Sequence, residues 1–432
     1  MHVVDVRKNE LTRGPGVVAA GVAAFVAFSC VGSAPPAGTD AGVGSGGLVG
    51  GGGGSGGVGA GGVGSGGTVA TGGAAGEVGQ SAGGVASGGG VSSGGAATGG
   101  GSSGGGAQTS GGAGGSDGSG GGSQDSADCN DVTGEPVLVV AKDGSGDHTT
   151  VQAALNTLSN SNTTPTQIRI RPGTYSEKLL VQKPHVTLCG QTGQEASTIL
   201  TYADTNTTSD GNGGTLGTSG SASINISASD VSVENLSMEN SHGPGIQAVA
   251  LLVTGSRVQF QHVRFLGYQD TLYVKSGSQY FRDCYVEGSV DFIFGAATAV
   301  FEECIVRSLT QGTAVVAPNT DQSTPYGIVF LGGELTGETS LNPGSIALGR
   351  NWGAYGAATF LRTELGDHIS GVGWEPMGEN TLATARFAEF ETTGPGADVG
   401  ARAAESTQLS PTEAAEYTVD GILSPWLPSF SE

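Results

Sequence analysis

A weak internal repeat constrains the fold of this chain more than any other feature. Each copy has an apolar residue, a second one three positions later and a third two positions after that. Clear copies are Val233/Leu236/Met238, Phe260/Val263/Phe265, Phe281/Cys284/Val286 and Phe301/Cys304/Val306, and looser ones are Phe330/Gly333/Leu335 and Phe360/Thr363/Leu365. The copies that begin at Phe260, Phe281 and Phe301 are offset by 21 and 20 residues. A repeat of this length is typical of a solenoid, in which each coil buries apolar side chains against its neighbours.

Short strands separated by turn residues surround the repeat. Residues 136–140, 167–170, 179–181 and 186–188 are predicted strands, whereas residues 150–155 favour a short helix. We therefore predict an all-β fold, a parallel β-helix formed by a single-stranded solenoid. A propeller or a sandwich is the alternative, but its strands would be joined by hairpins. The repeat region contains no Asn-Gly or Asp-Gly hairpin turn.

Composition divides the chain into three parts. Residues 1–30 have a basic start and a short apolar run, which is typical of an export signal. Residues 31–127 are mostly glycine, serine, alanine, valine and threonine, which predicts a disordered, flexible linker. Residues 128–432 have the length of one large domain.

The end of the export segment predicts a membrane anchor. It reads Ala27-Phe28-Ser29-Cys30, which resembles a bacterial lipoprotein cleavage box, so Cys30 is a candidate lipidation site. An ordinary signal peptide or a short anchor with an incidental cysteine is the alternative. Either interpretation predicts an extracellular or cell-surface protein, and the linker would let the domain move above a membrane.

The net charge of −22 limits the classes of partner. Nucleic acids and anionic membrane surfaces are recognised by clustered lysine and arginine, so neither is an expected partner, apart from a membrane reached through a lipid at Cys30. The six histidines are scattered and no aspartate-rich loop matches a calcium site. We expect no metal and no cofactor, and we expect a monomer.

Two cysteines occupy equivalent positions in consecutive copies of the repeat. Stacked strands lie about 4.8 Å apart, and a disulfide joins Cα atoms about 4.4–6.8 Å apart. In an exported protein this predicts a Cys284–Cys304 disulfide, with reduced, stacked core cysteines as the alternative. Cys129 and Cys189 are a second candidate pair.

Two aspartates also occupy equivalent positions. Asp270 and Asp291 each lie seven residues beyond the central residue of their copy, Val263 or Cys284. Their Cα atoms should therefore be about 5 Å apart on adjacent coils. Like charges this close favour one raised pKa and one anionic group, which suits acid–base chemistry. A solvated aspartate ladder is the alternative, but the flanking residues argue against it: Leu272, Tyr273, Phe292 and Phe294.

Five short motifs occur in one order between about Val137 and Pro428. They are Gly173-Thr174-Tyr175-Ser176-Glu177, Gln247-Ala248-Val249-Ala250-Leu251, Tyr268-Gln269-Asp270-Thr271-Leu272-Tyr273, Asp291-Phe292-Ile293-Phe294-Gly295 and Leu348-Gly349-Arg350-Asn351-Trp352. Together they resemble the pectin methylesterase (pectinesterase) family, bacterial type. The resemblance implies a right-handed parallel β-helix and a carboxylic ester hydrolase. Its expected substrate is methyl-esterified homogalacturonan (pectin), from which it releases methanol.

The resemblance also implies a role for each matched residue. Asp291 would attack the ester carbonyl, and Asp270 would protonate methanol and then activate water. Arg350 would hold Asp291 anionic, and Gln247 and Gln269 would donate N–H groups to the oxyanion. Four aromatic side chains would line the substrate groove: Trp352, Tyr273, Phe294 and Trp374. Thr218 would also contact substrate, whereas Phe292 is expected in the core.

One departure from the family pattern lies inside a motif. Asn351 stands where a proline is usual between the arginine and the tryptophan, and we expect it to loosen this segment. Two other functions stay open. One is a related β-helix esterase or thioesterase acting on an ester other than pectin. The other is a non-catalytic surface protein that binds polysaccharide.

Overall fold

The computed structural model describes residues 134–310 and 312–430. The expected signal segment, lipidation at Cys30 and the linker over residues 31–127 lie outside these residues. Cys129 of the second candidate cysteine pair also lies outside them, while Cys189 is disulfide-bonded.

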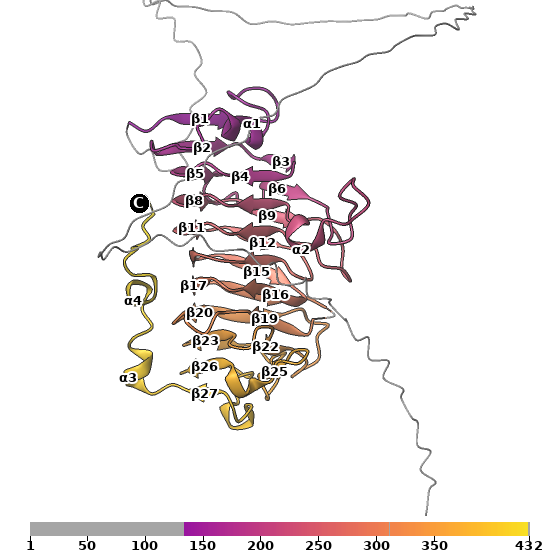
Figure 1. Ribbon diagram of the computed structural model, residues 1–432, viewed down its shortest axis with the longest axis vertical. Helices are drawn as coiled ribbons and strands as arrows, with labels where there is room; N and C mark the ends of the chain where they lie inside the picture. Colours follow the sequence, from indigo (N-terminus) through magenta and orange to yellow (C-terminus); the bar gives the residue numbers. More distant parts are fainter. Residues whose placement is uncertain (1–133, 311, 431–432) are drawn as a thin grey trace, which may run out of the picture. The chain divides into compact units, whose positions relative to one another are not determined.

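Three parallel sheets make up most of the described chain (Figure 1). The 11-stranded sheet A has the order β1 (Val137–Val140), β2 (Thr166–Ile170), β5 (Val186–Cys189), β8 (Val231–Glu234), β11 (Val258–Gln261), β14 (Ser278–Arg282), β17 (Thr298–Glu302), β20 (Ile328–Leu331), β23 (Ala357–Leu361), β26 (Arg386–Phe390) and β27 (Thr407–Gln408).

Sheets B and C have eight strands each. Sheet B has the order β3 (Gly173–Ser176), β6 (Thr198–Tyr202), β9 (Ser237–Asn240), β12 (Arg264–Leu266), β15 (Tyr285–Gly288), β18 (Ile305–Ser308), β21 (Glu334–Gly337) and β24 (Glu364–Leu365). Sheet C has the order β4 (Leu179–Val181), β7 (Ile224–Ile226), β10 (Leu251–Val253), β13 (Leu272–Val274), β16 (Val290–Gly295), β19 (Ala314–Pro318), β22 (Ala347–Asn351) and β25 (Trp374–Pro376).

From β2 to β25, each coil gives one strand to each sheet, as β11, β12 and β13 do before β14 returns to sheet A, whereas β1, β26 and β27 belong to sheet A alone. All the strand pairs in the three sheets are parallel, for example β11 with β14 and β13 with β16. The predicted parallel β-helix is therefore confirmed.

A ladder of phenylalanines from the repeat fills the interior. Phe260, Phe281, Phe301, Phe330 and Phe360 are partners in register on successive strands of sheet A. Consecutive rings stack with centroids 4.6, 4.3, 4.9 and 4.4 Å apart. Each such pair contributes about 0.5–1.5 kcal/mol beyond the burial of its area. The two looser copies of the repeat are therefore true coils.

In several coils, a residue with left-handed backbone conformation lies at the turn between the strand of sheet A and the strand of sheet B. Asn235, His262, Asp283 and Glu303 have φ of 57°, 51°, 51° and 51°, and each directly precedes the second apolar position of its copy. In the next copy that second position is Gly333, with φ of 70°. A Cβ on Gly333 would lie 2.3 Å from a backbone oxygen of the coil before it, so this coil has no room for an apolar side chain there. This explains why that copy is loose.

The predicted Cys284–Cys304 disulfide is wrong, because both cysteines are free and buried. They do stack on consecutive coils, since the strands that follow them, β15 and β18, pair in register. In-register side chains of parallel strands point the same way, so their Cβ atoms stay about 4.8 Å apart. A disulfide needs about 3.5–4.5 Å. Each thiol instead donates to a backbone oxygen of the preceding coil, Cys284 to Phe260 and Cys304 to Phe281, both at 3.5 Å.

The described helices are all short. They are α1 (Val151–Asn156), α2 (Gly217–Gly220), η1 (Leu382–Thr384), η2 (Val399–Ala401), α3 (Pro411–Ala414) and α4 (Val419–Leu423). The predicted helix near residue 150 is confirmed as α1, whose N-cap Thr150 accepts a hydrogen bond from the backbone N–H of Ala153. Within residues 134–310 and 312–430, no helix is long and apolar enough to cross a membrane.

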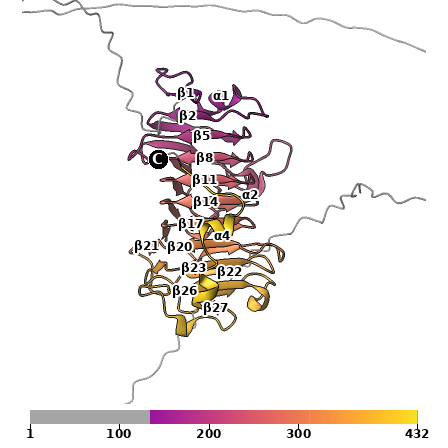
Figure 2. The same cartoon turned by 90° about the vertical axis from the view of Figure 1, so that its left-hand side faces the viewer.

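The last described residues fold back over the outer face of sheet A. Figures 1 and 2 show α3 and α4 lying along this face, with the chain returning toward β8. Ile422 and Leu423 of α4 pack in one cluster with Tyr280 and Val300 of the sheet. Farther on, the backbone N–H of Ser429 donates to the side-chain oxygen of Gln259 at 3.1 Å. This face of sheet A is thus covered from β26 back to β11.

Candidate active site

Asp270 and Asp291 lie side by side at sheet C, as the repeat predicts. Asp270 precedes β13 and Asp291 is the second residue of β16. The register that joins these strands puts Leu272 opposite Ile293, so the two aspartates also fall opposite each other. The backbone N–H of Asp270 donates to the oxygen of Val290 at 3.1 Å. Both aspartates are buried, 4% and 5% exposed, in a left-handed backbone with φ of 66° and 48°.

A β-bulge and a bidentate ion pair set the position of Asp291. Between β16 and β19 the register shifts, because Val290 faces Ala314 while Ile293, three residues on, faces Val316. Such an extra residue redirects the side chains near it. On β22, Arg350 donates from Nε to Oδ1 of Asp291 at 2.9 Å and from Nη2 to Oδ2 at 2.5 Å. Two parallel bonds hold the carboxylate in one orientation.

The surroundings separate the two carboxyl groups electrostatically. Burial, followed by the charge of Asp291, raises the pKa of Asp270 well above its usual range, and Arg350 opposes this only in part. Burial also raises the pKa of Asp291, but the hydrogen bonds and charge of Arg350 oppose that rise. The bond to Asp291 keeps the pKa of Arg350 above its ordinary value despite burial. These surroundings therefore favour the proton on Asp270 and the negative charge on Asp291.

Two glutamines stand beside the aspartates on adjacent coils. Gln247 and Gln269 form a parallel bridge just before β10 and β13, and the backbone N–H of Ala248 donates to the oxygen of Gln269 at 3.2 Å. Both side chains are half-buried. Among the described residues, neither side-chain NH₂ group has a hydrogen-bond partner. Both NH₂ groups thus stay available as hydrogen-bond donors.

Thr218 contacts a glutamine. Its hydroxyl donates to Oε1 of Gln247 at 2.9 Å, and the side-chain NH₂ of Asn206 donates to the same oxygen at 2.8 Å. Sequence reasoning missed Asn206, because it lies in a loop rich in threonine, asparagine and aspartate that carries no repeat or motif. Only the fold brings it to Gln247, 41 residues away along the chain.

Three of the four predicted groove aromatics form a cluster on the outer face of sheet C. Tyr273 and Phe294 stack with ring centroids 4.1 Å apart, and Trp352 lies 6.3 and 5.8 Å from them. The strand neighbours of Tyr273, Leu272 and Val274, point inward to the core, so Tyr273 points outward. Phe292 is buried in the core, as expected.

The prediction that Trp374 lines the groove is wrong. Trp374 is 1% exposed and stacks on Phe387 in the core, with centroids 4.3 Å apart. It is the register partner of Gly349, whereas Glu375 is the partner of Arg350. Register partners on parallel strands point the same way, and a Cβ on Gly349 would point at Val316 in the core, so Trp374 also points inward. A Cβ on Gly349 would lie 3.0 Å from the Trp374 ring, so the glycine leaves space for the indole.

Asn351 does not loosen its segment. It is fully buried, and its side-chain NH₂ donates to the backbone oxygen of Thr381 at 2.6 Å. The next residue is held in a similar way, because the side-chain NH₂ of Asn380 donates to the oxygen of Trp352 at 2.6 Å. The amide of Asn351 therefore secures the strand end that carries Arg350 and Trp352.

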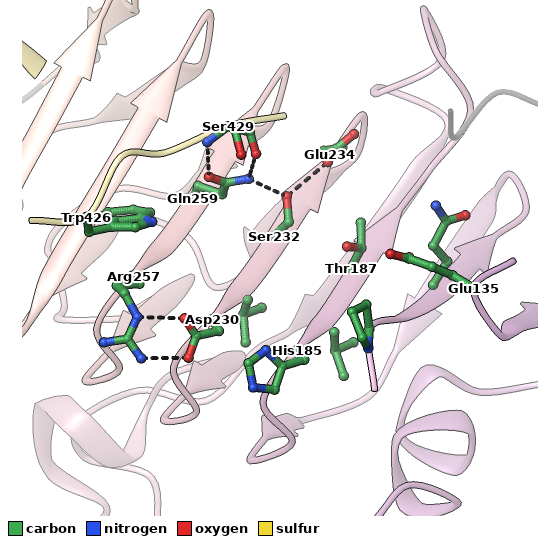
Figure 3. Close-up of a pocket in the computed structure, with 14 residues that line it drawn as sticks. Glu135, His185, Thr187, Asp230, Ser232, Glu234, Arg257, Gln259, Trp426 and Ser429 are labelled. Atoms are coloured by element: carbon green, nitrogen blue, oxygen red, sulfur yellow. Dashed lines mark hydrogen bonds and ion pairs between the residues drawn. The ribbon is translucent and has the colours of Figure 1, made fainter. Parts of the chain in front are cut away.

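A hollow of about 370 Å³ lies on the outer face of sheet A (Figure 3). Its lining includes the ion pair between Arg257 and Asp230 and the hydrogen-bonded residues Gln259 and Ser429. None of the residues predicted to form the site lines it. Among the described residues, no group of three or more histidine, cysteine, aspartate or glutamate side chains could hold a metal ion.

Comparison with known proteins matches the domain to one family. The family model described as Pectinesterase matches residues 137–425. Pectinesterase 31 from Arabidopsis thaliana is 37% identical over 296 residues, which cover 66% of this chain and 92% of that protein. Pectinesterase A from Emericella nidulans is 36% identical over 273 residues, which cover 62% and 82%. The solved structure of pectin methylesterase PemA from Erwinia chrysanthemi has a TM-score of 0.62 and 30% identity, covering 69% of this chain and 99% of that one.

Proposed function

The chain belongs to the pectinesterase family, and on that premise we propose that it demethylates methyl-esterified galacturonan and releases methanol. It is a carboxylic ester hydrolase. The observation that carries the mechanism is the pair of buried aspartates, of which Asp291 alone is bonded to Arg350. Such a pair has one proton and one negative charge, which is what a nucleophile and an acid need at the same time.

In the first step, the carboxylate of Asp291 attacks the carbonyl carbon of the methyl ester. Arg350 favours the anionic form and fixes the direction of the attacking oxygen. The carbonyl oxygen becomes an oxyanion, and the side-chain N–H groups of Gln247 and Gln269 donate to it. Loss of one such donor typically lowers kcat by about 10²–10³.

In the second step, Asp270 gives its proton to the methoxy oxygen and methanol leaves. Asp291 is then joined to the galacturonyl group as an anhydride, and Asp270 is a carboxylate. Asp270 next removes a proton from water, whose oxygen attacks the galacturonyl carbon. The bond to Asp291 breaks, which regenerates the anion at Asp291 and the proton on Asp270.

The outer aromatic cluster supports a sugar substrate. Tyr273, Phe294 and Trp352 lie on the same face of sheet C as Arg350, and Trp352 is partly exposed. The apolar face of a pyranose ring packs well on such side chains, and burial of apolar area contributes about 25 cal/mol per Å². An ester with no sugar ring would make little use of this cluster.

Methanol release from highly methylated pectin by the full chain tests the function. The wild type should release methanol, and Asp291→Ala should release none above background. If the wild type cleaves a simple ester or an acyl thioester but releases no methanol from pectin, the proposed substrate is wrong. If Asp291→Ala keeps near-full activity, the proposed nucleophile is wrong.

We propose an exported monomer that acts outside the cell, from a lipid anchor at Cys30 and through the linker over residues 31–127. The basic start, the apolar run and the cleavage-box sequence support the anchor. Cys30→Ala should release the protein from membranes into the soluble fraction. Continued membrane association of that variant would refute lipidation at Cys30, and light scattering would give the oligomeric state.

A further inference from the structure

The oxygen of the Gln247 side chain accepts two hydrogen bonds, and this determines which end of the amide meets the substrate. The donors are the NH₂ of Asn206 at 2.8 Å and the hydroxyl of Thr218 at 2.9 Å. An amide has two acceptor sites on its oxygen and two donor hydrogens on its nitrogen. Both acceptor sites are filled, so the NH₂ of Gln247 is left to face the site.

The opposite orientation of this amide would place an oxygen where the oxyanion forms. Two oxygens at that position repel each other, and the site would lose one of its two donors. A free glutamine side chain can rotate between the two orientations. We propose that Asn206 and Thr218 are positioning residues, which hold the Gln247 amide with its N–H groups directed at the oxyanion. This inference rests on the proposed ester hydrolysis.

The backbone around Asn206 is fixed by its own bonds. Its N–H donates to the backbone oxygen of Gln247 at 3.0 Å, and its oxygen accepts from the N–H of Gly217 at 2.9 Å. Asn206 is therefore attached at three points to Gln247 and to the start of α2, the helix that holds Thr218. Two lysines also hold α2, since Lys275 donates to the Ser219 hydroxyl at 3.2 Å and Lys178 to the oxygen of Gly220 at 2.6 Å.

Asn206→Asp is the sharpest test, because it changes hydrogen-bonding direction and hardly changes shape. A carboxylate only accepts, so it would bond the NH₂ of Gln247 and turn the oxygen of that amide toward the substrate. We expect kcat on methylated pectin to fall about 10²–10³-fold, as for loss of one oxyanion donor, with KM nearly unchanged. Thr218→Val, which removes the other donor, should lower kcat less, because Asn206 still holds the amide.

The double variant Asn206→Asp/Gln247→Ala separates this effect from added charge and from misfolding. If Asn206 acts through Gln247, the aspartate should cost no further activity once Gln247 is alanine. An equal fold-loss in both backgrounds would overturn the proposal. Asn212→Asp is the matched control, since it makes the same change at an exposed position of the same loop and should keep wild-type kcat.

A spectroscopic readout keeps the test independent of the pectin assignment. The side-chain amide resonances of Gln247, identified by their loss in Gln247→Ala, should shift in Asn206→Asp and stay in place in Asn212→Asp. Unshifted resonances in Asn206→Asp would overturn the positioning role. Failure of the wild type to release methanol would instead contradict the proposed function and leave this measurement valid.

Discussion

Arg350 binds Asp291 through two hydrogen bonds, Nε to Oδ1 at 2.9 Å and Nη2 to Oδ2 at 2.5 Å. Among the described residues, no cation bonds Asp270, although it lies opposite Asp291 and is equally buried. The two carboxyl groups thus differ in their hydrogen-bonding partners, because Arg350 on β22 bonds Asp291 and does not bond Asp270. Their proposed roles as nucleophile and acid follow from this difference.

Removal of Arg350 should change both stability and pH dependence. In Arg350→Ala the buried carboxylate of Asp291 loses its partner, which should lower the free energy of unfolding by about 3 kcal/mol. This is the lower end of the range for a broken buried pair, because the Arg350 side chain is 24% exposed. The pKa of Asp291 should rise, so the acidic limb of the pH–rate profile should move to higher pH. Chemical denaturation and methanol release between acid and neutral pH measure the two effects. An unchanged acidic limb would contradict the ion-pair role.

Arg350→Lys is the matched variant for this prediction. Lysine keeps the positive charge but cannot make the bidentate contact. We expect the acidic limb to stay near that of the wild type while kcat falls, because the attacking oxygen is no longer held in direction. If Arg350→Lys kept both the acidic limb and the kcat of the wild type, a positive charge at this position would be sufficient for activity and the bidentate contact would not be needed.

The raised pKa of Asp270 should make the active site a source of instability. Its folded-state pKa lies well above the unfolded value of about 3.9, because burial and Asp291 disfavour the charged form. The folded protein therefore binds a proton more tightly than the unfolded chain, and stability falls as pH rises between the two pKa values. Asp270→Asn removes this titration. The variant should be inactive yet more stable than the wild type at neutral pH, and the gain should vanish near pH 3.

Thermal unfolding of both proteins across this pH range checks the prediction. A wild type that is as stable as Asp270→Asn at every pH would show that Asp270 is not held in its neutral form by burial. The same proton should limit activity, because the acid role fails once Asp270 is ionised in the free enzyme. Methanol release should therefore decline on the alkaline side, as Asp270 loses its proton.

The repeat was sufficient to predict the coils, the placement of the stacked cysteines and the adjacency of Asp270 and Asp291. It could do so because register is a local property, in which a fixed number of residues separates equivalent positions. It did not predict the Cys284–Cys304 geometry, since closeness of Cα atoms does not make parallel side chains converge. The role of Asn206 could not be predicted from the sequence for another reason. Its partner is far along the chain, and only the completed loop brings them together.

The free cysteines give a direct chemical prediction. Burial, followed by the neighbouring Cys284, raises the pKa of the Cys304 thiol well above its ordinary value, so the folded protein should resist alkylation there. After unfolding without a reductant, both Cys284 and Cys304 should react with iodoacetamide, and mass spectrometry of the peptides would show both labels. Detection of a disulfide-linked Cys284–Cys304 peptide pair would instead show that the two cysteines are bonded and contradict this prediction. Cys189, which is disulfide-bonded, is the internal control and should stay unlabelled.

Trp352, which follows β22, and Trp374, the first residue of β25, should respond to replacement by alanine in opposite ways. Trp374 is 1% exposed and stacks on Phe387, so Trp374→Ala should cost about 3–5 kcal/mol of stability, as for other large-to-small core changes. Trp352 is partly exposed beside Tyr273 and Phe294, so Trp352→Ala should change stability by less than about 1 kcal/mol. It should mainly lower kcat/KM on methylated pectin, through weaker contact with the sugar ring.

Denaturant unfolding and methanol release on the same two variants decide between these outcomes. A small molecule such as methyl acetate serves as the matched substrate, because it carries the methyl ester without a sugar ring. Trp352→Ala should lose activity on pectin while its activity on methyl acetate stays near that of the wild type. Equal loss on both substrates would assign Trp352 to the support of Arg350, its neighbour on the strand end held by Asn351. Strong destabilisation of Trp352→Ala would place its indole in the core instead.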